Sequence, residues 1–149
     1  MSFSFTTAGR IIFGSGSAAQ LRNVVEEYGQ RVFVIAGHHT PADEPPLAGL
    51  SPAMAIWRSK GEPSVEGVRA AVSAAREFAP DVIVALGGGS VIDTAKSVGI
   101  LLANSGDLMD YLEVIGAGQS LSSETVPVIA LPTTSGTGSE VGRSSVVSE

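Results

Sequence analysis

Two glycine- and hydroxyl-rich segments contain the residues that are best suited to do chemistry. The first, GGGSVIDTAK at residues 87–96, follows an apolar run and precedes an amphipathic stretch. Glycines let the backbone approach a phosphate closely, and a helix that begins there offers free N–H groups and a partial positive charge. This context favours a phosphate-binding loop. The alternative is a purely structural helix start, in which Ser90 and Asp93 form a capping box and Lys96 pairs with Asp93.

The same segment departs from two common phosphate-binding patterns. A Walker A loop needs glycines where Ser90 and Ala95 stand, and the dinucleotide pattern G-x-G-x-x-G/A needs a small residue at Ile92. That second pattern does occur at residues 14–19, GSGSAA. The next apolar run, however, ends without the acidic residue that would bind a ribose. We therefore interpret residues 14–19 as a turn before a helix.

The second candidate segment is LPTTSGTGSEV at residues 131–141, which also follows an apolar run. Its hydroxyl and N–H groups can donate hydrogen bonds to phosphate and ribose oxygens. Thr137 and Glu140 also have capping-box spacing, so a helix start is the structural alternative. If both preceding runs are parallel strands, the two loops face one crevice at the carboxyl edge of a sheet.

The elements that must position these loops alternate between strands and helices. Continuous apolar runs predict buried strands, and a shorter run predicts a fourth strand: residues 31–36, 81–86, 126–131 and 54–57. Helical spacing marks three further segments: residues 17–28, 64–79 (with Ser64 as cap) and 91–103. Loose alternation predicts an N-terminal β-hairpin over residues 3–13. The expected fold is α/β, a Rossmann-like, doubly wound, mostly parallel sheet that carries this hairpin.

Composition limits the possible functions of the chain. Its 149 residues fit one domain, and a 44% hydrophobic share with 16% charged residues argues against disorder. A net charge of −6 argues against nucleic-acid binding, and the absence of cysteine excludes disulfides and thiol catalysis. Neither a leader peptide nor a membrane-spanning run is recognisable. We expect a cytoplasmic protein with a small-molecule partner.

The two loops resemble those of the iron-containing alcohol dehydrogenase family, part of the dehydroquinate-synthase-like group. GGGSVIDTAK and LPTTSGTGSEV are nearly as that family has them, and GEPSV at residues 61–65 and FGSG at residues 13–16 are also similar. The resemblance covers almost the whole chain. It implies the NAD(P)-binding N-terminal half of an enzyme that oxidises a small alcohol to an aldehyde or ketone by metal-assisted hydride transfer.

The resemblance also implies a set of cofactor-binding residues. Residues 87–90 match the segment that binds the pyrophosphate, and the other residues line the rest of the site. The full set is Gly37, Gly87, Gly88, Gly89, Ser90, Asp93, Thr133, Thr134 and Thr137. NAD-preferring members usually carry Asp where Gly37 stands. A carboxylate there binds the ribose hydroxyls and repels a 2′-phosphate, so Gly37 permits NADP as well as NAD.

The catalytic residues and the metal site of the family have no counterpart in this sequence. The family binds Fe²⁺ or Zn²⁺ through one Asp and three His on a helical C-terminal domain, whereas this chain has only His38 and His39. We therefore expect residues 1–149 to be the cofactor domain alone, inactive without a helical domain, and we expect the protein to form a homo-oligomer. Residues 148–149 resemble the start of a further strand. A maleylacetate reductase-type enzyme and a nucleotide-binding module without turnover are the alternatives.

Overall fold

The structure, a computed structural model, describes residues 7–43 and 45–148 and contains a four-stranded parallel sheet. The strands are β1 (Arg31–Gly37), β2 (Ala53–Ser59), β3 (Val82–Gly87) and β4 (Val128–Pro132). The helices are a 3₁₀ turn, η1 (Ser17–Gln20), and α1 (Leu21–Glu26), α2 (Val65–Phe78), α3 (Gly89–Ala103) and α4 (Leu108–Tyr111). The strand order is β2-β1-β3-β4. This architecture confirms the predicted doubly wound α/β class.

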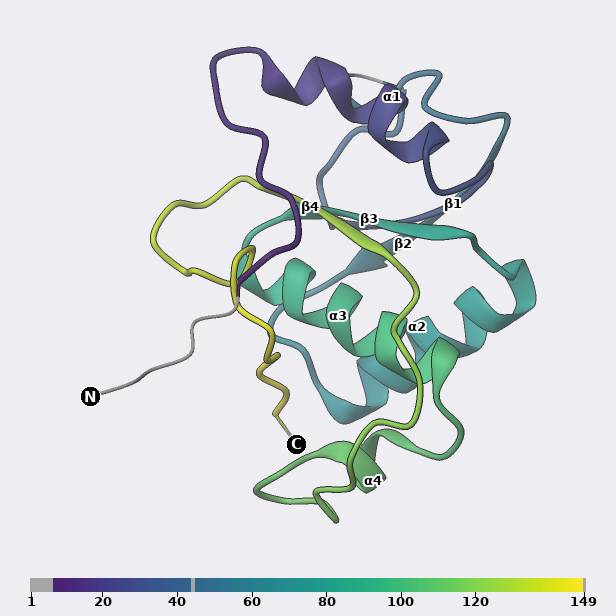
Figure 1. The fold of residues 1–149 in the computed structure, drawn as a ribbon, viewed down its shortest axis with the longest axis vertical. Coiled ribbons are helices and arrows are strands. Elements are labelled where there is room, and N and C mark those ends of the chain that lie inside the picture. Colours follow the sequence, from purple (N-terminus) through teal and green to yellow (C-terminus); the bar gives the residue numbers. More distant parts are fainter. Residues whose placement is uncertain (1–6, 44, 149) are drawn as a thin grey trace.

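Alternating residues of the strands build one core on each face of the sheet. Val32 and Val34 of β1 pack with α1 and with Leu47 and Leu50 of the loop before β2. Phe33 and Ile35 point to the other face, and there they join the buried sides of α2 and α3. Figure 1 shows this layering, with α1 on one side of the sheet and α2 and α3 on the other. Burial on both faces explains why β1 and β3 are continuous apolar runs.

The carboxyl ends of the strands lie in one row, because the register is continuous across the sheet. Gly37 is paired with Ser59, Ala36 with Leu86, and Gly87 with Pro132. The chain leaves β1 toward one edge of the sheet, to β2, and leaves β3 toward the other edge, to β4. The connections therefore diverge between β1 and β3. Such a divergence point is where open α/β sheets bind ligands.

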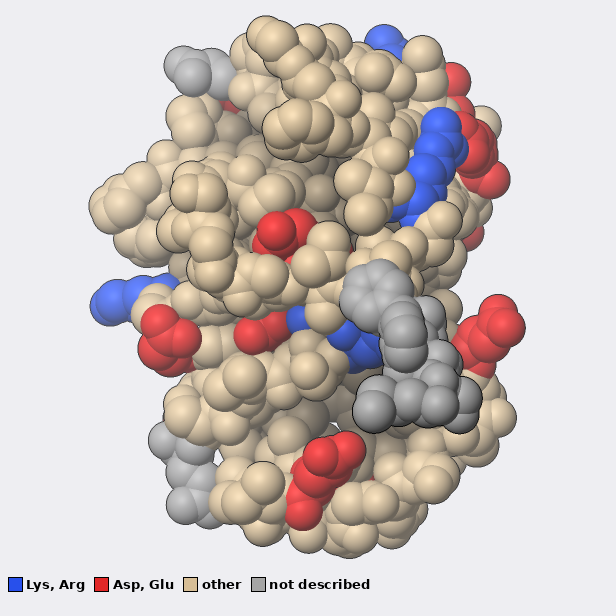
Figure 2. Space-filling model, turned by 60° about the vertical axis from the view of Figure 1, so that its left-hand side comes forward, with Lys and Arg blue, Asp and Glu red and all other residues tan. Residues whose placement is uncertain are grey.

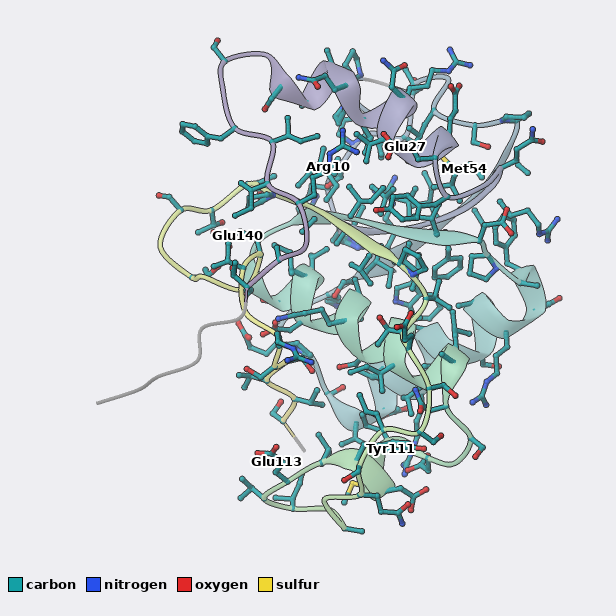
Figure 3. All side chains as sticks on the ribbon, in the orientation of Figure 1. Arg10, Glu27, Met54, Tyr111, Glu113 and Glu140 are labelled. Atoms are coloured by element: carbon teal, nitrogen blue, oxygen red, sulfur yellow. The ribbon has the colours of Figure 1, made fainter. Side chains whose placement is uncertain are left out.

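The N-terminal hairpin is not supported by the residues that can be described. Its first arm, residues 3–6, lies outside the described part, and residues 7–13 contain no strand. Ile11 and Phe13 are 62% and 99% exposed, so their alternation has no core face to bury. Residues 7–13 instead lie beside the loop after β4 and beneath α1 (Figure 1). There the Arg10 guanidinium donates a hydrogen bond to the Glu27 carboxylate at 2.8 Å (Figure 3).

The other elements differ from the predictions mainly at their ends. The helix predicted over residues 17–28 is a 3₁₀ turn followed by the short α1, and α3 begins two residues before the predicted position. The strand predicted over residues 54–57 extends to Ser59. Among residues 7–43 and 45–148, no helix combines the length and the apolar composition that crossing a membrane requires.

Candidate functional site

The start of α3 has no side-chain cap. Gly88 is the N-cap residue, in an extended conformation, and no side chain accepts a hydrogen bond there. The amides of Val91 and Ile92 donate to the Gly88 carbonyl at 3.1 and 3.2 Å, which begins the helical ladder. The amides of Gly89 and Ser90 precede that ladder and have no partner within the helix. With no acidic residue in the first turn, the positive end of the helix dipole points to the carboxyl edge of the sheet.

The Ser90–Asp93 capping box, the structural alternative to a phosphate-binding loop, does not form. Ser90 lies inside the helix, and its hydroxyl donates to the Glu62 carboxylate at 3.4 Å. Asp93 is also within the helix, because α3 begins at Gly89 and its N-cap position is occupied by a glycine. The predicted ion pair is confirmed, since Asp93 Oδ1 lies 2.8 Å from Lys96 Nζ. The cap that the spacing predicted is therefore missing, and the helix start stays open.

The loop after β4 lies directly against the glycine loop after β3. The Thr133 amide donates to the Gly87 carbonyl at 2.9 Å. A Cβ atom added to Gly88 would lie 3.1 Å from Thr134 Oγ1, which is tighter than ordinary packing. The prediction that these two loops lie together at one edge of the sheet is confirmed. Any larger residue at position 88 would therefore crowd the Thr134 side chain.

The second half of the loop after β4 faces Gly89. A Cβ atom on Gly89 would lie 3.1 Å from Ser139 Oγ and 3.3 Å from Thr137 Cβ. The Thr137–Glu140 capping box, which was the structural alternative for this loop, does not form, because no helix begins there and Thr137 Oγ1 instead accepts a hydrogen bond from the Ser139 amide at 3.3 Å. Figure 3 places Glu140 in this loop. One carboxylate oxygen of Glu140 is buried without a hydrogen-bond partner in the described part of the chain.

Asp93 faces the chain that follows this loop. It is 8% exposed, and its Oδ2 accepts a hydrogen bond from the Val146 amide at 3.3 Å. Its Oδ1 lies beside Lys96 but makes no hydrogen bond of standard geometry. The short separation of the charges makes this an ion pair all the same. A role for Asp93 in cofactor binding stays a prediction, and the observed contacts are internal.

Gly37 ends β1 in the same row as Gly87, and a Cβ atom added to it would lie 3.4 Å from Thr40 Oγ1. The Arg58 guanidinium, at the end of β2, donates to the Gly37 carbonyl at 3.4 Å. Sequence reasoning missed Arg58, because the strand was predicted to end at Trp57. The position of Arg58 directly after the predicted strand was the signal that could have identified it. His38 and His39 are exposed, with ring centroids 5.0 Å apart.

The residues that can be described hold no cluster suited to a metal. Within residues 7–43 and 45–148, no group of three or more His, Cys, Asp or Glu side chains is close enough to bind an ion. Glu44, which follows the two histidines in the sequence, lies outside the described residues. Figure 2 shows charged side chains scattered over the face that holds the loop after β4, without a continuous basic surface in that view.

Comparison with known proteins decides the family. The family model for "Iron-containing alcohol dehydrogenase" matches residues 8–149. The chain belongs to the iron-containing alcohol dehydrogenase family. It is 31% identical to sulfoacetaldehyde reductase of Bilophila wadsworthia, with 100% of this chain and 40% of that protein covered. It is 32% identical to an alcohol dehydrogenase of Thermococcus barophilus, with 96% and 40% covered.

Solved structures of family members have the same fold. The iron-containing alcohol dehydrogenase of Thermococcus thioreducens is 30% identical, with a TM-score of 0.77 over 97% of this chain and 41% of that one. Sulfoacetaldehyde reductase of Bifidobacterium kashiwanohense, solved in complex with NAD⁺, is 27% identical, with a TM-score of 0.78 over 95% and 38%. The chain spans about 40% of the length of these relatives.

Proposed function

We propose that this chain is the NAD(P)-binding domain of an alcohol dehydrogenase of the iron-containing family. The observation that carries the proposal is the open start of α3, where uncapped amides face the threonine-rich loop after β4. Helix starts of this kind at the carboxyl edge of a sheet bind pyrophosphate groups. The NAD⁺ complex of the Bifidobacterium relative supports the choice of ligand. The cytoplasmic location and a homo-oligomeric state stay predictions from the sequence.

The residues present fit a dinucleotide. The amides of Gly89 and Ser90 would donate to the pyrophosphate oxygens, and the dipole of α3 would stabilise their charge. The hydroxyls of Thr134 and Thr137, both exposed beside the glycines, would donate to phosphate or ribose oxygens. A side chain on Gly88 would fill the space that these groups share. When bound, the nicotinamide supplies the hydride acceptor or donor of the reaction.

Two features at the end of β1 support NADP as a cofactor. Gly37 has no carboxylate to bind the ribose hydroxyls or to repel a 2′-phosphate. Arg58 places a guanidinium within 3.4 Å of the Gly37 carbonyl, and such a group binds phosphate strongly. NADPH should therefore bind at least as tightly as NADH. Arg58→Gln should weaken NADPH binding about tenfold and leave NADH binding nearly unchanged, whereas the exposed Arg22→Gln should alter neither.

The catalytic metal is not accounted for by the described residues, which hold no suitable cluster. We propose that Fe²⁺ or Zn²⁺ is bound by a helical domain outside residues 1–149, and that the present chain contributes cofactor binding. Purified protein supplied with Fe²⁺, NAD(P)H and a panel of aldehydes should not consume the cofactor. Robust turnover by these residues alone would contradict this division of roles.

Calorimetric titration with NADH and NADPH tests the binding site. Gly88→Val should abolish binding, because its side chain would occupy the space of the pyrophosphate. Gly9→Val is the matched control, since a Cβ atom on Gly9 meets nothing within 4 Å. Circular dichroism should show that both variants are folded. Unchanged affinity in a folded Gly88→Val protein would move the site elsewhere.

A further inference from the structure

The ammonium group of Lys96 lies in a ring of oxygen atoms. Lys96 is in the second turn of α3, and its side chain is only 14% exposed. Nζ is 2.8 Å from Asp93 Oδ1 and donates to the carbonyls of Ser139, at 3.1 Å, and Gly142, at 3.5 Å. It also donates to the Ser144 carbonyl. An ammonium group has three donors and no acceptor, so these oxygens use its full capacity.

All three carbonyls come from one stretch of chain, residues 139–146, which we call the tethered segment. Two more contacts join this segment to α3. The Val146 amide donates to Asp93 Oδ2 at 3.3 Å, and the hydroxyls of Ser97 and Ser145 are 2.9 Å apart. The tethered segment contains no helix or strand. An isolated bridge at Ser148 lies just beyond its end. Polar contacts with α3 therefore take the place of backbone pairing.

The tethered segment contacts the glycine loop after β3 through Ser139. The carbonyl of Ser139 binds Lys96, and its Oγ lies against Gly89. Its amide donates to Thr137 Oγ1 at 3.3 Å, which fixes the Thr137 side chain next to the same glycine. The ammonium is thus linked through Ser139 to the two hydroxyl-bearing residues that lie against the start of α3.

We propose that Lys96 is a positioning residue whose ammonium serves as a built-in cation for the tethered segment. It holds residues 139–146 on α3 and so keeps Thr137 and Ser139 at the distance from Gly89 that ligand binding needs. A neutral side chain cannot do this, because three backbone carbonyls would then lose their donor and the buried Asp93 carboxylate would lose its ion-pair partner. The effect on cofactor affinity rests on the proposed function, and the effect on the segment does not.

The first test uses Lys96→Ala, with the exposed Lys60→Ala as its control. Amide hydrogen exchange in residues 139–146 should become at least about tenfold faster in Lys96→Ala, and NADPH affinity should fall by a similar factor. Exchange in β1 and β3 should not change. Unchanged exchange in the tethered segment would overturn the proposal.

Chemical rescue separates positioning from simple packing. Propylammonium can enter the space left in Lys96→Ala and donate to the same carbonyls, whereas tetramethylammonium has no N–H donor. Propylammonium should return exchange to within about threefold of the original rate and tetramethylammonium should not. Equal effects of the two ions, or none, would overturn the proposal.

A second variant guards against misfolding and separates the two proposals. The double substitution Asp93→Asn with Lys96→Met leaves no unpaired charge buried, so it should fold. Its tethered segment should still exchange rapidly, and slow exchange there would contradict the role of the ammonium. If the unmodified protein binds neither NADH nor NADPH, the proposed function fails. The exchange and rescue results would nevertheless still decide the role of Lys96.

Discussion

The starts of α2 and α3 face similar surroundings and are built in opposite ways. Each helix follows a parallel strand at the carboxyl edge of the sheet. At α2, the Ser64 hydroxyl accepts a hydrogen bond from the Gly67 amide at 3.1 Å, and Glu66 supplies a negative charge in the first turn. At α3, glycine occupies the cap and the first turn has no acidic residue. The sequence completes one helix start and leaves the other open.

The short helix α4 has a side-chain cap, as α2 does. Asp107 accepts a hydrogen bond from the Met109 amide, and Asp110 accepts one from the Asp107 amide, so even this helix has a full capping box. The helix α1 continues from a 3₁₀ turn and has no separate start. Among the described α-helices that start on their own, only α3 lacks a side-chain cap, although the single 3₁₀ turn η1 also begins at a glycine without one. This difference identifies the place where a ligand can supply the missing acceptor.

The largest expected effect comes from making α3 resemble α2. Gly88→Asp would place a carboxylate over the free amides and repel phosphate, and NADPH affinity should fall by about 100-fold, or about 2.7 kcal/mol. Stability should change by no more than a few tenths of a kcal/mol, because the better cap that Asp provides is offset by the crowding of its Cβ atom against Thr134 Oγ1. Calorimetry and urea unfolding measure the two effects. Gly88→Asn, equal in size but uncharged, measures the loss that is due to bulk alone, so it should bind NADPH more tightly than Gly88→Asp does, and equal affinities would rule out the electrostatic contribution.

The reverse change removes the cap from α2. Ser64→Ala should lower the free energy of unfolding by about 1 kcal/mol, since the Gly67 amide loses its acceptor. Cofactor affinity should not change. Urea unfolding checks the loss, and Ser73→Ala on the exposed face of the same helix is the control. A fall in affinity without a fall in stability would mean that the two helix starts are not functionally distinct.

The smallest expected effect concerns the charged cap of α4. Hydrogen bonds from Arg69, and then from the Met109 amide, lower the pKa of Asp107 to about 2 from its ordinary 3.8. A depressed pKa stabilises the fold above the ordinary value, and this contribution is lost as the pH falls from about 4 to about 2. Both side chains are about half exposed, at 50% and 45%, so the contribution is below about 1 kcal/mol.

Asp107→Asn tests this expectation. The variant should be slightly less stable at pH 7 and should match the unmodified protein near pH 2, as measured by urea unfolding. Arg69→Gln should reproduce most of the loss at pH 7. A difference between Asp107→Asn and the unmodified protein that grows in acid would contradict the direction of the pKa shift.

Most of the fold could be predicted because periodicity reports burial. The apolar runs of β1 and β3 are buried on both faces, and the Ser64 cap follows from local chemistry. The N-terminal hairpin could not be judged in this way, because alternation indicates a strand only where a core face and a neighbouring strand exist. Residues 7–13 have neither a core face nor a neighbouring strand, and Ile11 and Phe13 remain exposed.

The site was partly predictable for a similar reason. The glycine and threonine loops follow strand ends, so a parallel sheet brings them together whatever their detailed conformation. Capping-box spacing misled at Ser90 and Thr137, since a cap also depends on where the helix starts, and Gly88 starts α3 earlier. Arg58 and the carbonyl partners of Lys96 depend on tertiary contacts between distant segments. No local pattern encodes such contacts.

The most direct measurement is an amide NMR titration of the unmodified protein with NADPH and NADH. The central claim is that the open start of α3 binds the dinucleotide while the capped start of α2 does not. The amides of Gly89 and Ser90 should therefore show the largest shifts, together with those of Thr134 and Thr137. The amides of residues 65–67 should not move. Saturable binding that leaves Gly89 and Ser90 unchanged, or that shifts residues 65–67 instead, would contradict the account.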